Sequence, residues 1–349
     1  MMAKAVVAGA LGLVGSSISN HLLTAAGWEV LGLARSTPRV ATDFTCVAVD
    51  LLDREACFAQ AGRLKAATHV FYCARASRGD PAEEAAVNRE MLVNLIEALE
   101  SAGAPLRHIQ LVHGTKWYGS HLGPYRTPAR EDDPRHMPPN FYYDQQDYVA
   151  ALQKERNWTW SAVRPHIVCG FSAYYPHNAM MVLAAYGTLC RHYGLPLRFP
   201  GSSECFRSVS MLTDARLLAK AMLWAASEPR CANEAFNIIN GDYFRWENVW
   251  PALADFFGVP AGPVQQIRLA DMMADKGPVW DRIVRDHGLQ PYRLDDLVNW
   301  RFGDFIFAAG WDDMSSMVKA RRHGFVEAID SEHMLLDQLA AFRRDRIIP

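Results

Sequence analysis

The first half of the chain alternates short β-branched apolar runs with intervals long enough to hold a helix. The strand candidates are KAVVAG, WEVLGLAR, FTCVAVD, THVFYCA, RHIQLVHG and TWSAVRP. A strand, a crossover helix and a second strand form the βαβ unit of a parallel sheet. The chain has 349 residues, half of them hydrophobic, enough for one large domain and a smaller lobe. We therefore predict an α/β fold with a doubly wound parallel sheet.

The second half turns helical and rich in aromatic residues from Trp246 onward, in VWPALADFFG, VWDRIVRDHG and EHMLLDQLAAFRR. A further strand-like segment, EAFNIING, follows the helix-like DARLLAKAMLWAASEP. We expect residues 1–165 and about 206–245 to form the sheet domain. Residues 166–205 and 246–349 would then form a smaller, mostly helical lobe that binds substrate.

Charge and composition exclude several classes of protein. The net charge of −2 gives no basic surface for nucleic acid or anionic lipid, so we expect neither partner. No apolar run approaches the roughly 18 residues needed to cross a bilayer, so we expect no membrane contact. The seven cysteines are scattered singly without a CxxC pair, which argues against a disulfide framework and a zinc site. We expect no metal, and a location in the reducing cytoplasm.

A glycine motif lies between the first strand and the first helix, at Gly9, Gly12 and Gly15. Glycine at these positions permits a tight turn, backbone approach to a pyrophosphate, and close packing of helix on sheet. Backbone N–H groups around Leu13 and Val14 would then face the pyrophosphate at the positive end of the helix. The motif predicts a Rossmann-type dinucleotide site, and its GxxGxxG spacing is typical of extended short-chain reductases.

The end of the second strand indicates which dinucleotide binds. An acidic residue there would accept hydrogen bonds from the ribose of NAD, whereas Arg35 and Ser36 suit the 2′-phosphate of NADP. Asp50 and Leu51 follow the third strand, where related enzymes contact the adenine amino group. A helix N-cap is an equally good interpretation of Asp50. The sequence therefore favours NADP(H).

The usual catalytic pair of such reductases, a tyrosine and a lysine four residues apart on one helix, is absent. Lys116 instead follows the fifth strand, at the sheet edge where ligands of α/β folds bind. Tyr143 lies where the next long helix starts. A nearby cation would tune the phenol for acid–base work, since its ordinary pKa is about 10. Taken singly, each residue is equally well a surface lysine or a half-buried tyrosine.

The chain resembles the progesterone 5β-reductase/iridoid synthase-like (PRISE) enzymes over nearly its whole length. The resemblance rests on the glycine motif, GTKWYG, NFYYDQQD, RPHIVCGFS, AFNIINGDYFRWENVW, VWDRIVRDHGLQP and SSMVKARRHGF. It implies Lys116 and Tyr143 as catalytic residues, with backbone at His166 and Ile167 flanking the nicotinamide. It also implies NADPH-dependent reduction of the C=C bond of an apolar enone, steroid-like, terpenoid-like or small and cyclic, by a homodimer.

Departures from the plant pattern leave the substrate open: Arg75 stands where the plant enzymes have tryptophan, and the segment after Lys116 is altered. We expect an apolar pocket. Its candidates are Trp117, Tyr142, Phe171, Tyr174, Tyr175, Met180, Met181, Phe302 and Met317. Two alternatives remain: a carbonyl reductase or nucleotide-sugar epimerase on the same scaffold, and a non-enzymatic NADP(H) sensor.

Overall fold

The computed structural model describes residues 2–349 and is built around a seven-stranded parallel sheet. The strand order across the sheet is β10-β6-β5-β4-β1-β2-β3. The strands are β1 (Ala3–Ala8), β2 (Trp28–Ala34), β3 (Thr45–Ala48), β4 (His69–Tyr72), β5 (His108–Val112), β6 (Thr159–Arg164) and β10 (Glu234–Asn237). The order reverses at β1, which lies between β2 and β4, so the sheet is doubly wound as predicted.

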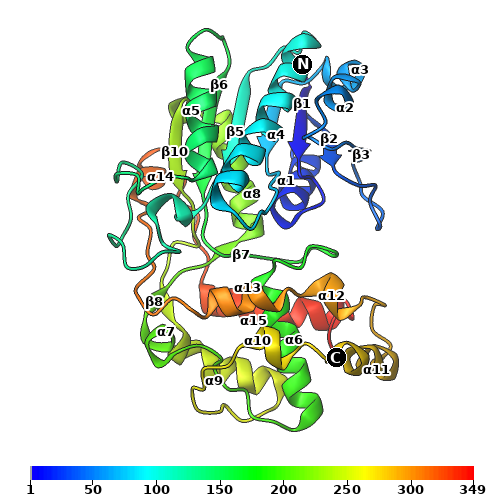
Figure 1. Ribbon diagram of the computed structural model, residues 1–349, viewed down its shortest axis with the longest axis vertical. Coiled ribbons are helices and arrows are strands. Elements are labelled where there is room, and N and C mark those ends of the chain that lie inside the picture. Colours follow the sequence, from blue (N-terminus) through cyan, green and yellow to red (C-terminus); the bar gives the residue numbers. More distant parts are fainter. Residues whose placement is uncertain (1) are drawn as a thin grey trace.

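Helices cover both faces of this sheet (Figure 1). On one face, α1 (Leu13–Thr24) packs against α8 (Ala215–Ser227). On the other lie α2 (Arg54–Phe58), α3 (Ala61–Leu64), α4 (Pro81–Ser101) and α5 (Phe141–Gln153). Each face has its own hydrophobic cluster. Strands buried on both faces read as continuous apolar runs, which explains why the sequence pattern revealed them.

The lower part of the molecule in Figure 1 is mostly helical. Its core includes the fully buried Trp250 and Trp280. Its helices are α6 (Ala179–Tyr193), α7 (Ser203–Arg207), α9 (Trp246–Phe257), α10 (Leu269–Met272), α11 (Gly277–His287), α12 (Leu294–Leu297), α13 (Trp300–Ile306) and α15 (Ser331–Arg344). Two short ladders accompany them, β7 (Val168–Cys169) with β9 (Thr213–Asp214), and β8 (Val209–Ser210) with β11 (Phe244–Arg245).

One late segment returns from this helical part to the sheet. Helix α14 (Val318–Arg322) contacts β10, and Met317, Ala320 and Phe325 are buried in the cluster beneath α1 and α8. The sequence had assigned these residues to the substrate lobe. The division of the chain at the predicted boundaries stays a prediction.

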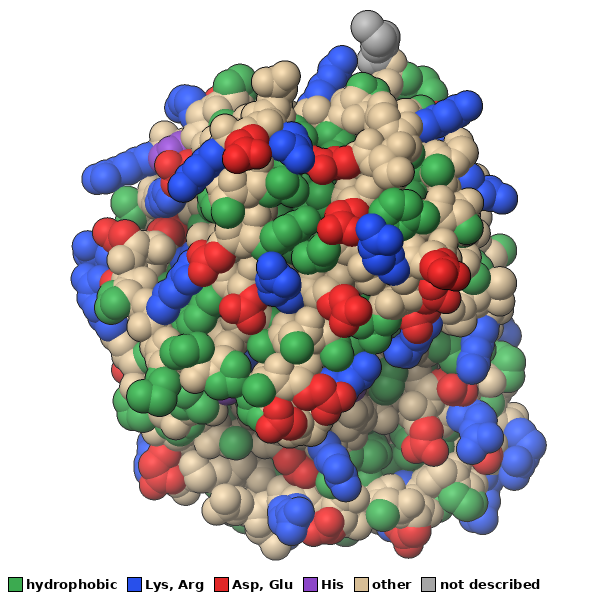
Figure 2. Space-filling model, turned by 45° about the horizontal axis from the view of Figure 1, so that its top comes forward, with side chains coloured by type: hydrophobic (Ala, Val, Ile, Leu, Met, Phe, Trp, Pro, Cys, Tyr) green, Lys and Arg blue, Asp and Glu red, His purple; other side chains and the backbone are tan. Residues whose placement is uncertain are grey.

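On the face shown in Figure 2, acidic and basic side chains are interspersed. Within residues 2–349, no helix is both long enough and apolar enough to span a bilayer.

Candidate active site

A cleft of about 800 Å³ lies at the carboxyl edge of the sheet. Its floor is made by the β1–α1 turn and by residues that follow β2, β3, β4, β5 and β6. Residues of α13 and the preceding Asn299 form the opposite wall. The cleft therefore lies at the reversal of strand order, where open α/β sheets bind their ligands.

The glycine motif forms the tight turn at the start of this cleft. Gly9 has φ +75°, and a Cβ atom there would lie 2.9 Å from the backbone of Ala74. A Cβ atom on Gly15 would lie 2.1 Å from the Gly9 carbonyl oxygen, so neither position accepts a side chain. Gly12 caps α1 without any side-chain hydrogen bond, and it lines the cleft with Leu13 and Val14. The positive end of the 12-residue helix is thus open to an anion.

The residues expected to choose the nucleotide also line the cleft. Arg35 and Ser36 follow β2, and Asp50 and Leu51 follow β3. The Asp50 side chain accepts a hydrogen bond from the Leu52 amide at 3.0 Å. The N-cap of α2 is Asp53 and not Asp50, which answers the alternative raised by the sequence.

Lys116 lies in the 3₁₀ turn η1 (Thr115–Tyr118) after β5 and lines the cleft. Its ammonium is 5.3 Å from the centre of the Phe305 ring. Burial and the nearby Arg75 lower the pKa of Lys116, while Glu84 opposes them. Arg75 also lines the cleft and forms an ion pair with Glu84 at 2.9 Å.

The adjacent tyrosines at the start of α5 have different surroundings. Tyr142 lines the cleft, and its ring centre is 4.9 Å from that of His113. Burial raises the pKa of Tyr142, and Arg75 counteracts this in part. Tyr143 is not among the lining residues: its hydroxyl donates to the Trp117 carbonyl at 2.5 Å and accepts from the His136 amide at 3.2 Å. Lys116 and Tyr142 therefore both line the cleft. Tyr143 packs in the same buried aromatic cluster as Tyr142 but does not line the cleft.

The predicted pocket residues divide in the same way. Tyr174, Tyr175 and Phe302 line the cleft with Tyr142. The other candidates pack elsewhere: Trp117 in the cluster around Tyr143, Phe171, Met180 and Met181 with the helical core, and Met317 under the sheet. Large apolar residues fill cores as readily as pockets, and periodicity alone does not separate the two.

The turn after β6 places His166 and Ile167 on the cleft wall. Ile167 has φ +38°, an unfavourable conformation for a β-branched residue. The His166 amide donates to the Thr213 hydroxyl at 3.1 Å, and that hydroxyl donates back to the His166 carbonyl at 2.9 Å. The surrounding hydrogen bonds hold the strained turn in place.

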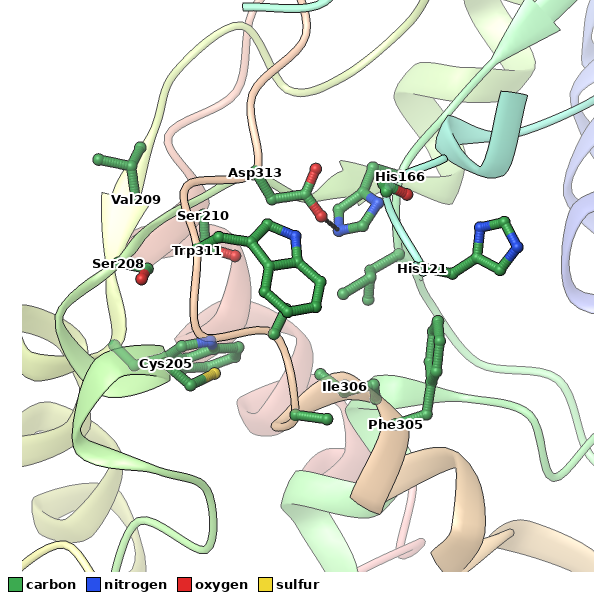
Figure 3. A pocket seen from close by; sticks show the side chains of 15 residues that line it. His121, His166, Cys205, Ser208, Val209, Ser210, Phe305, Ile306, Trp311 and Asp313 are labelled. Atoms are coloured by element: carbon green, nitrogen blue, oxygen red, sulfur yellow. Dashed lines mark ion pairs between the residues drawn. The ribbon is translucent and has the colours of Figure 1, made fainter. Parts of the chain in front are cut away.

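The His166 side chain has partners that the sequence analysis did not identify. It also borders a second cavity of about 90 Å³ beside the cleft (Figure 3). His166 Nε2 lies 2.9 Å from Asp313, and Nδ1 lies 2.7 Å from the Thr115 hydroxyl. Asp313 is far away in the sequence and belongs to no local motif. Only the tertiary fold brings it to His166.

A model of the PRISE-like Rossmann-fold domain matches residues 49–325 of the chain. An (S)-8-oxocitronellyl enol synthase of Nepeta cataria is 36% identical over 366 residues, covering 99% of this chain and 93% of that protein. A 3-oxo-Δ(4,5)-steroid 5-β-reductase of Arabidopsis thaliana is 33% identical over 369 residues, again covering 99% and 93%.

Solved structures with a similar fold are more distant in sequence. The UDP-glucose 4-epimerase of Thermus thermophilus, solved with NAD, has a TM-score of 0.68 at 20% identity and covers 97% of this chain and 99% of its own. The Thermotoga maritima UDP-glucose 4-epimerase has a TM-score of 0.70 at 18% identity, covering 98% and 99%. At these identities the match concerns the fold alone, and it agrees with the Rossmann-type architecture predicted from the glycine motif.

Proposed function

Because the chain belongs to the PRISE family of extended short-chain dehydrogenases/reductases, we propose that it reduces the C=C bond of α,β-unsaturated carbonyl compounds with NADPH. The observation that carries this proposal is the meeting of Tyr142 and Lys116 with the glycine turn in one cleft. The names of two relatives, an oxocitronellyl enol synthase and a Δ4-steroid 5β-reductase, agree with an unsaturated carbonyl substrate.

The chain has a group for each part of NADPH, which when bound supplies the hydride. The amides at the start of α1, with Gly9, Gly12 and Gly15, would hold the pyrophosphate. Arg35 and Ser36 would hold the 2′-phosphate, with Asp50 and Leu51 beside the adenine and the His166–Ile167 backbone beside the nicotinamide.

The substrate oxygen would bind to the Tyr142 hydroxyl. Because burial raises its pKa, the phenol keeps its proton at neutral pH and serves as a hydrogen-bond donor. The Lys116 ammonium adds positive charge to the same cleft and stabilises the negative charge that develops on the oxygen. Tyr142 thus takes the role that the sequence had assigned to Tyr143.

The rest of the pocket suits an apolar body. Tyr174, Tyr175, Phe302 and Phe305 line the cleft, and Phe305 lies next to Lys116. We propose a terpenoid-like, steroid-like or small cyclic enone as the substrate class.

The test is to follow NADPH oxidation with cyclohexenone-type and acyclic enones and to identify the products. We expect the saturated ketone, and no turnover of unconjugated alkenes, because the site activates only a bond joined to the carbonyl. An allylic alcohol as main product would indicate a carbonyl reductase. NADPH binding without turnover of any enone would indicate a sensor.

A further inference from the structure

A chain of hydrogen bonds joins Asp313 to the cleft through a histidine and a threonine. Asp313 Oδ2 lies 2.9 Å from His166 Nε2, and His166 Nδ1 lies 2.7 Å from Thr115 Oγ1. Thr115 lines the cleft directly beside Lys116. His166 and Asp313 both border the small neighbouring cavity, where Figure 3 shows them facing each other.

The geometry leaves the Thr115 hydroxyl proton free to point into the cleft. Thr115 Oγ1 accepts a hydrogen bond from the Ser120 hydroxyl at 3.1 Å. When the His166 imidazole is protonated, Nδ1–H donates to the same oxygen. Both accepting positions of Thr115 are then filled, so its own O–H is directed elsewhere. Thr115 is buried, and the cleft is the space it lines.

Asp313 is suited to hold a positive charge on His166. Burial raises the pKa of Asp313, but the charge of His166 and hydrogen bonds from His166 and Tyr125 outweigh burial and lower the pKa. Both partners are nearly buried, with the side chains of His166 and Asp313 11% and 9% exposed.

A second histidine, His121, also lines the small cavity. Burial and the nearby Lys116 lower the pKa of His121 to about 4, so His121 is neutral at pH 7.

We propose that Thr115, His166 and Asp313 form a proton relay that protonates the substrate α-carbon. The electron pair of the enolate forms the new C–H bond with the Thr115 hydroxyl proton, and Thr115 recovers a proton from His166 Nδ1. Nδ1 of the neutral His166 then regains a proton from solvent through the small cavity, whose wall includes the exposed Ala308, while Nε2–H stays hydrogen-bonded to Asp313. Asp313 stays ionised throughout. The relay rests on the proposed function. It would supply the proton at the α-carbon, and NADPH would supply the hydride at the β-carbon.

The first test needs no cofactor. The relay run backwards removes an α-proton from a saturated ketone, with Tyr142 stabilising the enolate oxygen. The full-length protein should therefore exchange the α-protons of cyclohexanone for deuterium in D₂O, followed by NMR. We expect His166→Gln and Thr115→Val to slow this exchange at least about 100-fold, the usual scale of general acid–base catalysis. Thr115→Ser, which restores the hydroxyl, should bring the rate back to within a few-fold.

A matched histidine–aspartate pair that lines neither the cleft nor the small cavity gives the control. His333 lies 3.6 Å from Asp330 at the start of α15, and its side chain is 81% exposed. His333→Gln should leave the exchange unchanged. NADPH titration checks that His166→Gln and Thr115→Val still fold and bind the cofactor.

The results separate the relay from the proposed function. Reduction of enones together with unchanged exchange in His166→Gln and Thr115→Val would overturn the relay and leave the reductase intact. Exchange that depends on both residues, without reduction of any enone, would overturn the reductase and leave the relay as part of an enolising site. Reduction in D₂O should place deuterium at the α-carbon of the product. Slower deuterium incorporation in both His166→Gln and Thr115→Val would support the relay and the reductase activity together.

Discussion

Tyr142 and Tyr143 are neighbours in the chain, yet they contact different parts of the molecule. Successive residues of a helix point about 100° apart, because 3.6 residues make one turn. At the start of α5, this turn directs Tyr142 to the cleft and Tyr143 to Trp117 and His136. The Asn140 side chain caps the helix by accepting from the Tyr142 amide at 3.1 Å, which sets where α5 begins.

The two phenols should respond differently to loss of the hydroxyl. Tyr142→Phe removes the donor to the substrate oxygen and should lower turnover on the order of 10²–10³-fold, with NADPH affinity unchanged. Tyr143→Phe removes a buried hydrogen bond to Trp117 and should cost about 1 kcal/mol of stability, with turnover changed only a few-fold. Steady-state kinetics and denaturant titration measure the two effects. The opposite order of turnover losses would return the catalytic role to Tyr143.

Arg35 should decide the preference between the two nicotinamide cofactors. A charge-assisted contact to the 2′-phosphate is worth roughly 1.5–3 kcal/mol, so Arg35→Ala should weaken NADPH binding about ten- to 150-fold. NADH affinity should stay the same. Arg54, which pairs with Glu97 outside the cleft, gives the matched control Arg54→Ala. Calorimetric titration of NADPH and NADH into the unmodified protein, Arg35→Ala and Arg54→Ala measures these affinities. Equal affinities for NADPH and NADH in the unmodified protein would refute the assignment of Arg35 to the 2′-phosphate.

Backbone-determined sites could be predicted from the sequence, whereas side-chain direction could not. The glycine positions depend on local conformation and close backbone approach: Gly9 and Gly12 lie in the predicted turn, Gly15 lies in the first turn of α1, and all three line the cleft. The choice between Tyr142 and Tyr143 depends on the exact start of α5 and on what packs against each ring. The pairing of His166 with Asp313 depends on tertiary contacts between segments far apart in sequence.

At the scale of elements, Asp214 joins two helices. It caps α8, accepting from the Arg216 amide at 2.7 Å, and it forms an ion pair with the Arg216 guanidinium at 2.6 Å. Gln338 of α15 donates to the same carboxylate at 3.1 Å. Burial raises the pKa of Asp214, but the hydrogen bonds and charge of Arg216 outweigh it and lower the pKa. One buried carboxylate thus ties a sheet-covering helix to the helical part.

Removing this carboxylate should destabilise the fold. We expect Asp214→Ala to cost about 2–4 kcal/mol, the sum of a lost cap and lost charged hydrogen bonds. Asp330→Ala removes the exposed cap of α15 and should cost only about 1 kcal/mol. Denaturant unfolding measures both. Equal costs would show that the link to Gln338 contributes nothing.

The charge of Asp214 also predicts a pH dependence. Because its pKa is lowered on folding, its contribution is complete above its ordinary value of 3.8 and is lost as the pH falls through the lowered value. Asp214→Asn should therefore be less stable than the unmodified protein at pH 7, and the difference should shrink toward pH 3. A constant difference in unfolding free energy would contradict the charge effect.

The strands and longer helices could be read from the sequence because burial on both sheet faces and helical periodicity are local signals. The expected WEVLGLAR run became β2 (Trp28–Ala34), and TWSAVRP became β6 (Thr159–Arg164). The short helices α10, α12 and α14 could not be read in this way. Four or five residues carry too little periodicity, and tertiary packing holds such elements in place.

For the whole molecule, the cleft is built from both parts of the fold. The sheet edge supplies the glycine turn, while Asn299, Arg301 and Phe302 supply the facing wall. Cofactor binding should therefore stabilise the entire fold. NADPH at 100 times its Kd should add about 2.7 kcal/mol and raise the Tm by a few degrees. Scanning calorimetry should show a smaller rise with NADH at the same concentration, and a smaller rise for Arg35→Ala with NADPH. Equal shifts for both cofactors would contradict the 2′-phosphate site.

The return of residues 317–325 to the sheet has a consequence for how the protein is made. The apolar face beneath α1 and α8 stays incomplete until Met317, Ala320 and Phe325 have left the ribosome. The edge strand β10 likewise becomes available only after residue 237, beyond the whole of α6. Synthesis from the N-terminus therefore cannot release a finished sheet with its covering helices before the later helical segments are made. A chain that stops early would expose this apolar face, so a nascent chain needs protection from aggregation until its last helices have emerged.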